Sequence, residues 1–441
     1  MNIKYLKTEQ KTKTTVKFVD SIIILLLLSV SIVSAQTNDK KYSLEECVQI
    51  ALQNNPGIIS SSYSVDESAA RVDEARSGYF PSVNINSSFD RVSNEGVITS
   101  PYNNYNAGVS ARYYLFQGLK TNASVNAANY NYQASSYQHE VNKQDMILKI
   151  TQGYYRMLQS ERLIGSADKT IERAKLFLDY ANAKFKSGLA SRSDILKAEV
   201  ELSNSNLTLI KAKNDFLAAK GNLNLLLGLS ADSPIFIIDD LAIIEQNQFQ
   251  EFDELKKQSY QNRPELKKFN EQLNVQKSSI QIAKGDFLPT LSADASYNYG
   301  GTEISSLKEN WVYGLTLSIP LFSGFSTKAR VAEEEIALKG LEKQFESLSQ
   351  QVSLDVWNAY LNIKETDERI INAKTFLENA QENLRITEGQ YREGVGSMIE
   401  VIDAQTNYVI AEQTFIQSLA DYKVAVASLK RATGINTFQE K

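Results

Sequence analysis

Residues 184–198 read KFKSGLASRSDILKA, and 206 positions later residues 390–404 read QYREGVGSMIEVIDA. The matched positions are Gly188 with Gly394, Asp194 with Glu400, and Ala198 with Ala404. Upstream, residues 75–83 match residues 283–291 at an offset of 208. A nearly constant offset over half the chain indicates one ancestral unit that was duplicated, with a two-residue length change between Val83 and Leu115. We therefore expect a repeated architecture.

The first 35 residues have the composition of a secretory signal peptide. Five lysines precede an apolar stretch at residues 22–33, and Val33-Ser34-Ala35 offers small side chains for cleavage. The stretch is short against the roughly 20 apolar residues that a membrane anchor needs. We expect cleavage after Ala35, and hence export.

Composition narrows the classes of function. Removing five lysines and two acids from the 47 basic and 52 acidic residues leaves 42 and 50, a net charge of −8. An acidic chain without a basic block is not expected to bind nucleic acid. Cys47 and His139 are the single cysteine and histidine, so intrachain disulfides, Ser-His-Asp triads and most zinc sites are not expected. We expect no cofactor, no metal and no catalytic site. Cys47 should pack on the apolar face of the first helix.

The prolines divide the chain into helical and extended parts. Pro56 and Pro264 interrupt the first helix of each copy, whereas residues 102–233 and 321–441 contain no proline. Because proline costs about 3 kcal/mol inside a helix, these stretches suit long helices. The predicted helices are 119–186, 194–227, 325–392 and 400–433. Heptad seams support them, one at Leu338, Leu341, Phe345, Leu348 and Val352, another at Ile402, Val409 and Ile416.

Four shorter segments alternate between apolar and polar residues: 83–90, 106–115, 291–299 and 311–319. This pattern is typical of strands in an outer-membrane barrel, although a half-buried soluble hairpin would also produce it. In a barrel, Leu315 would face lipid and Thr316 the lumen.

Four strands cannot close a barrel, and lipid does not tolerate open sheet edges. Two chains would supply eight strands, whose interior is filled by side chains. Three chains would supply twelve, which leaves room for a channel. We therefore expect a homotrimer in which the long helices, each about 100 Å at 1.5 Å per residue, continue the barrel as a second tube.

With these features the whole mature chain resembles TolC-type outer membrane efflux proteins. The motifs that carry the resemblance are Phe80-Pro81 with Leu288-Pro289, Leu115-Phe116-Gln117-Gly118 with Leu321-Phe322-Ser323-Gly324, and Val401-Ile402-Asp403-Ala404. The resemblance implies a passive trimeric exit duct of a tripartite efflux or type I secretion system. It would span the outer membrane and the periplasm and bind a periplasmic adaptor and an inner-membrane pump or secretion ATPase.

The resemblance also implies site residues. Gly188, Leu189, Gly394 and Val395 would form periplasmic tips that contact the adaptor, and Asp194, Glu400 and Asp403 would line the gate. The alternatives are glycines that merely end helices and acids that merely stabilise helix starts. A gate arginine of the family aligns here with Gly396, and Arg192 is the candidate to replace it.

The expected fold is mainly helical with a β membrane portion. The expected organisation is a signal peptide (1–35), a first repeat (36–233), a linker (234–252) and a second repeat (253–441). Two other classes stay open: a secreted coiled-coil structural protein without channel activity, and an enzyme with carboxylate catalysis on a helical scaffold.

Overall fold

The computed structural model of the protein describes residues 40–93, 101–242 and 250–435. The chain divides into two units, Met1–Tyr42 and Ser43–Lys441. The described part of the first unit, residues 40–42, includes the short strand β1 (Lys41–Tyr42). The predicted signal peptide, residues 1–35, lies outside the described residues.

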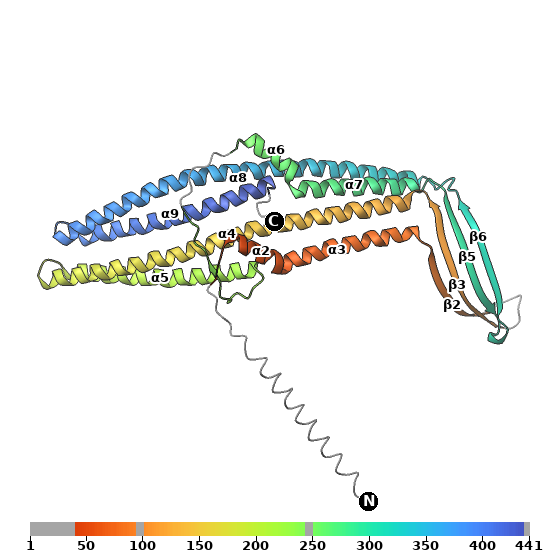
Figure 1. Ribbon diagram of the computed structural model, residues 1–441, viewed down its shortest axis with the longest axis horizontal. Coiled ribbons are helices and arrows are strands. Elements are labelled where there is room, and N and C mark those ends of the chain that lie inside the picture. The colour runs from red at the N-terminus through yellow and green to blue at the C-terminus, as the bar shows by residue number, and fades with distance from the viewer. Residues whose placement is uncertain (1–39, 94–100, 243–249, 436–441) are drawn as a thin grey trace, which may run out of the picture. The chain divides into compact units, whose positions relative to one another are not determined.

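Within the second unit, one order of elements occurs twice: two helices, two strands, a long helix and a returning helix (Figure 1). The first copy consists of α2 (Leu44–Asn54), α3 (Pro56–Arg76), β2 (Ser82–Val92), β3 (Tyr102–Gln117), α4 (Lys120–Lys186) and α5 (Arg192–Leu226). The second consists of α6 (Phe252–Asn262), α7 (Pro264–Gly285), β5 (Thr290–Gly301), β6 (Lys308–Ser318), α8 (Ser326–Glu393) and α9 (Met398–Thr433). Short pieces are η1 (Ser77–Tyr79), β4 (Phe236–Ile237) and η2 (Ile304–Ser306). The mainly helical fold with a β portion is confirmed.

Both predicted breaks occur at proline. Pro56 and Pro264 are the first residues of α3 and α7, where a missing N–H leaves no helix hydrogen bond unmade. The preceding Asn55 is extended, and its side chain accepts a hydrogen bond of 2.8 Å from the Gly57 N–H. The chain therefore turns between two helices instead of ending one.

The long helices pack as antiparallel pairs, α4 with α5 and α8 with α9 (Figure 1). Buried positions recur at steps of three and four, in α8 at Val352, Val356, Ala359, Ile363, Thr366, Ile370 and Ala373, and in α9 at Val401, Ala404, Tyr408 and Ala411. This spacing is that of a coiled-coil seam. In α9 the buried Val401 and Tyr408 each lie one position before the predicted Ile402 and Val409. Ile402 and Val409 lie beside the seam and are half-buried.

The strands form one antiparallel sheet in the order β2-β3-β5-β6, with β2 and β6 as its edges within the described chain. Ser82 pairs with Arg112 in the first hairpin. Shifting these residues by 208 and 206 gives Thr290 and Ser318, which pair in the second hairpin. The sequence offsets therefore reproduce the register of the second hairpin.

One face of this sheet is apolar and exposed. It carries Val83, Ile85, Phe89, Val109, Tyr113, Tyr297, Trp311, Tyr313, Leu315 and Leu317. Soluble monomers rarely expose so large a continuous apolar surface. None of the described helices is both long and apolar enough to cross a membrane.

At the end of the sheet, the two repeats meet through glycines. A Cβ on Gly118 would lie 2.4 Å from the carbonyl oxygen of Gly285, so this backbone contact requires glycine. Beside it, Asp286 accepts hydrogen bonds of 2.9 Å from both Lys120 and Arg330. The start of α4, the end of α7 and the start of α8 are thereby joined.

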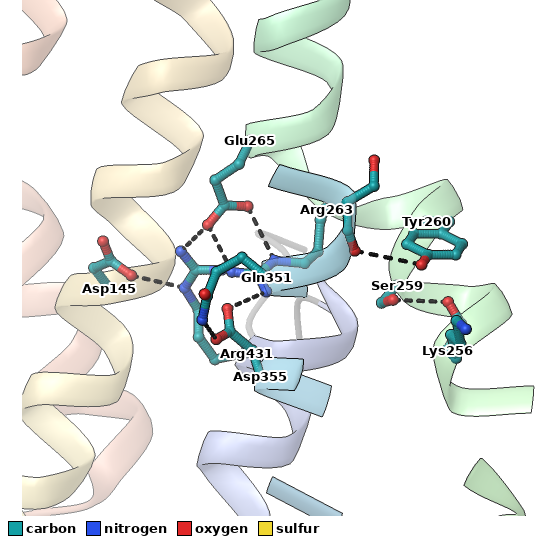
Figure 2. A network of polar contacts seen from close by, with 10 residues as sticks. Asp145, Lys256, Ser259, Tyr260, Arg263, Glu265, Gln351, Asp355 and Arg431 are labelled. Carbon is teal, nitrogen blue, oxygen red and sulfur yellow. Dashed lines mark hydrogen bonds and ion pairs between the residues drawn. The ribbon is translucent and has the colours of Figure 1, made fainter. Parts of the chain in front are cut away.

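A second connection between the repeats is the ion-pair network in Figure 2. Arg263, whose side chain is 9% exposed, binds Glu265 at 3.0 Å and Asp355 at 2.9 Å. Arg431 of α9 binds Asp145 of α4 at 2.7 Å and also donates to Glu265. Four helices from both repeats are joined by these five side chains.

The network predicts a pH dependence of stability. Burial alone would raise the pKa of Glu265, but hydrogen bonds from Arg263 and Arg431 outweigh it and lower the pKa to about 2. A depressed carboxyl pKa contributes stability that is present above the unfolded value near 4.5 and lost as the pH falls toward 2. The contribution at neutral pH is on the order of 3 kcal/mol.

We expect Glu265→Gln to lower the apparent melting temperature at pH 7, with the difference from wild type shrinking toward about pH 3. Circular dichroism of the purified protein in detergent measures this. Glu382→Gln, which removes the acid of an exposed pair with Arg385, is the control and should change little. If Glu265→Gln lowered the melting temperature equally at both pH values, the prediction would be wrong.

Candidate functional site

The two helix tips are built alike. Gly188 follows α4 with φ +75°, and Gly394 follows α8 with φ +84°. The next residue in each case reaches back: Leu189 N–H donates to the Lys184 carbonyl at 2.8 Å, and Val395 N–H to the Gln390 carbonyl at 3.0 Å. This is the bonding of a Schellman turn, whose left-handed residue is favourable for glycine.

We call Gly188, Leu189, Gly394 and Val395 the tip surface. Leu189 is 78% exposed and Val395 is 81% exposed. No described atom would lie within 4 Å of a Cβ on Gly188. Each tip therefore offers an apolar side chain next to bare backbone, which a partner helix can approach closely.

The predicted gate acids begin the returning helices. The Ser397 N–H donates to the Glu400 carboxylate at 2.8 Å, and the Ser191 N–H donates to the Asp194 carboxylate at 3.1 Å. These are capping interactions, and they start the helices at Met398 and Arg192, two residues before the predicted starts. Both acids thus have a local structural role whatever else they do.

The three acids differ in surroundings. Asp194 is half-buried and lies 3.8 Å from the Lys197 ammonium. Glu400 and Asp403 are exposed and, being three residues apart on α9, lie on one helix face. The structure therefore brings Glu400 and Asp403 together and leaves Asp194 on the other hairpin.

Gly396 occupies a tight turn. A Cβ there would lie 3.0 Å from the Gln390 Cβ and 3.1 Å from the Tyr391 nitrogen, while the Gly396 N–H donates to the Gln390 carbonyl. An arginine at this place would require the loop to shift. Arg192, the candidate replacement, is exposed at the first position of α5.

The two tips pack against each other. Their shared core contains Phe177, Ala181, Ala198, Tyr391, Met398 and Val401. The Lys184 ammonium donates to the Tyr391 carbonyl at the end of α8 and lies 4.4 Å from the centre of the Tyr391 ring. Burial raises the pKa of the Tyr391 phenol, and the nearby Asp194 carboxylate raises it further. The contacts of Lys184 with Tyr391 therefore connect the first tip to the second.

Lys184 and Tyr391 were not singled out by the sequence. Their matched positions in the other repeat are Gln390 and Phe185, so comparison of the copies gave them no weight. A lysine in the last turn of a helix was the available signal, because cations there stabilise free carbonyls. Cys47 is fully buried as predicted, and His139 lies in α4 and hydrogen-bonds Ser61 at 2.6 Å.

At the other end, the apolar sheet face carries aromatic side chains near the β5–β6 turn. The Trp311 and Tyr313 rings stack with centres 5.3 Å apart. The Tyr297 hydroxyl donates to the Glu309 carboxylate at 3.0 Å. Amphipathic rings at the border of an apolar band are typical of membrane β-barrels. Across the described chain, no cluster of three or more His, Cys, Asp or Glu side chains is arranged to hold a metal ion.

Sequence comparison agrees with this architecture. The profile of the outer membrane efflux protein family matches residues 47–229 and 255–435, one match for each repeat. The chain belongs to the outer membrane efflux protein family. The resemblance to TolC-type proteins is thereby confirmed. The predicted localisation to the outer membrane is confirmed as well.

Individual relatives are distant but cover nearly the whole chain. The outer membrane protein TolC of Vibrio cholerae is 21% identical over 90% of this chain and 92% of its own length. TolC of Escherichia coli is 22% identical over 93% of this chain and 85% of its own length.

Solved structures share the fold. A crystal structure of CusC superimposes with a TM-score of 0.78 at 19% identity, over 89% of this chain and 92% of that one. The open state of the MtrE outer membrane channel of Neisseria gonorrhoeae gives 0.76 at 19% identity, over 90% and 91%.

The tip contacts lead to a prediction for Lys184. Lys184→Met keeps the aliphatic stem and removes the ammonium that binds the Tyr391 carbonyl. We expect faster hydrogen exchange and faster proteolysis in the last turn of α8, with a stability loss of about 1 kcal/mol. Lys186→Met, in the last turn of α4, is the control. Equal protection of the α8 end in wild type and Lys184→Met would contradict the assignment.

Proposed function

We propose that this chain forms, as a homotrimer, the passive exit duct of a tripartite efflux or type I secretion system. The observation that carries the proposal is the four-stranded sheet with an exposed apolar face and two edge strands, β2 and β6. Such a sheet is compatible with lipid only when neighbouring copies cover its edges. Three copies give twelve strands with a lumen.

The same proposal assigns the parts of the chain. Residues 1–35 act as the signal peptide, residues 36–233 and 253–441 are the two repeats, and residues 234–252 link them. The tip surface contacts a periplasmic adaptor, which connects the duct to an inner-membrane pump or secretion ATPase. Asp194, Glu400 and Asp403 belong to the gate, with Arg192 in the place of the family's arginine.

The repeats also predict how neighbouring copies pair. Inside one chain, Ser110 of β3 pairs with Ser296 of β5. Moving each residue to its equivalent in the other repeat gives Thr316 of β6 and Ser88 of β2. We infer that Thr316 of one copy lies opposite Ser88 of the next. Cross-strand neighbours have Cα atoms about 4.5–5.5 Å apart, a distance that a disulfide can span.

The double variant Thr316→Cys/Ser88→Cys should therefore link chains on oxidation, giving dimer and trimer bands on a denaturing gel. Native Cys47 will not interfere, because burial, together with Glu46 and Glu45, raises its pKa to about 12. Thr316→Cys/Asn86→Cys, two residues out of register, is the control and should link poorly. Absence of linked species would argue against the trimer, and better linkage of the control would argue against the register.

The gate assignment has its own test. Three copies would bring the Glu400 and Asp403 carboxylates together as a cation-selective constriction. Glu400→Gln keeps an acceptor for the Ser397 N–H, so the helix cap survives while the charge is removed. With Asp403→Asn added, we expect weaker cation preference and weaker block by a trivalent cation in planar bilayers. Unchanged selectivity and block, with intact trimers, would place these acids outside the conduction path.

A further inference from the structure

The polar face of the sheet is almost free of charge along its middle. It carries Asn84, Asn86, Ser88, Ser110, Ser296, Asn298 and Thr316. Asp90 and Lys308 lie at the end near the turns: Lys308 belongs to the last pair of β5 with β6, and Asp90 lies two pairs before the last pair of β2 with β3. At the opposite end, where the strands join the helices, Arg112 lies directly across from Asp294.

The two side chains form an ion pair with unequal exposure. The Arg112 Nε donates to Asp294 Oδ1 at 2.6 Å. The other carboxylate oxygen accepts from the Ser292 hydroxyl at 2.8 Å and the Thr316 hydroxyl at 3.4 Å. Asp294 is 33% exposed and Arg112 59% exposed. The carboxylate is therefore surrounded by donors, whereas the guanidinium is the end that faces outward.

The surrounding row leaves this guanidinium accessible. Paired residues of the four strands form a row across the sheet. In this row, Ser82 of β2 lies next to Arg112, and Gly314 of β6 lies next to Asp294. No described atom would lie within 4 Å of a Cβ on Gly314. Tyr114, on the same face of β3, also hydrogen-bonds the Arg112 side chain, so a small solute would approach the pair from the side of Gly314.

If three copies close a barrel as proposed, comparing the two repeats shows how many Arg112–Asp294 pairs that barrel contains. The equivalents of Arg112 and Asp294 in the other repeat are Ser318 and Asn86, both uncharged. Each boundary between copies would therefore carry a neutral pair. Three guanidinium groups, and not six, would face the lumen at this height.

We propose that Arg112, held in place by Asp294, contacts the anionic groups of solutes that leave through the duct. A guanidinium presents a planar fork of donors that matches carboxylate and phosphate oxygens. Apart from Asp294 and, near the turns, Asp90 and Lys308, the residues named on this face are amides and hydroxyls, so the guanidinium is the exposed cation that a solute meets where the strands join the helices. The barrel end thus favours anions, opposite in sign to the acids at the helix tips.

The test is the reversal potential of the reconstituted channel under a potassium chloride gradient. Arg112→Gln should shift selectivity toward cations, and Asp294→Asn, which leaves the guanidinium uncompensated, should shift it toward anions. The permeability of each ion should change by up to roughly fivefold, the factor for a unit charge about 4 Å from an ion in water, and in opposite directions for anions and cations. Arg91→Gln removes an arginine from the other face of β2 and should cause no shift.

Opposite shifts for Arg112→Gln and Asp294→Asn, with Arg91→Gln unchanged, would support the proposal, since a distorted barrel would not produce opposite signs. Shifts of the same sign, or none, in channels that conduct would overturn it and leave the duct intact. A wild-type protein that inserts as trimers and does not conduct would instead overturn the proposed function.

Discussion

A bilayer supplies no hydrogen-bond partners, so a sheet that enters it must pair every edge strand with another strand. This constraint determines most of the molecule, because β2 and β6 are the edges of the sheet in a single chain. Closing them against neighbouring copies sets the number of strands around the barrel. Since β3 and β6 lead directly into α4 and α8, it also sets the number of long helices that continue below it.

Much of this architecture follows from a few residue types in the sequence. Pro56 and Pro264 mark both helix breaks, because proline excludes the preceding residue from helical geometry. Gly188 and Gly394 mark both tips, because the turns there need a positive φ. The offsets of 208 and 206 also carried the pairing of the first hairpin over to the second. Local rules and a repeat were sufficient for these features.

Other features left no readable pattern. The Lys184 ammonium binds a backbone carbonyl, and every residue has one, so the sequence does not show which carbonyl is the partner. Arg431 and Asp145 are 286 positions apart and have no periodic relation. The positions of the candidate gate acids were predicted, but their capping by Ser191 and Ser397 was not, so both helix starts were placed late. Turns and helix breaks can be predicted from local sequence. Contacts that depend on tertiary packing become visible only in the folded chain.

The position of Arg431 has a consequence for biogenesis. This residue lies in the last turn of α9, yet its guanidinium binds Asp145 and Glu265, which come much earlier in the sequence. Because a chain is synthesised from its N-terminus, α4 and α7 are made before α9. Until then Glu265 lacks one of its two arginines, and burying it is unfavourable. The junction of α4, α7, α8 and α9 therefore closes only once α9 is present, so a residue made late completes the packing of residues made early.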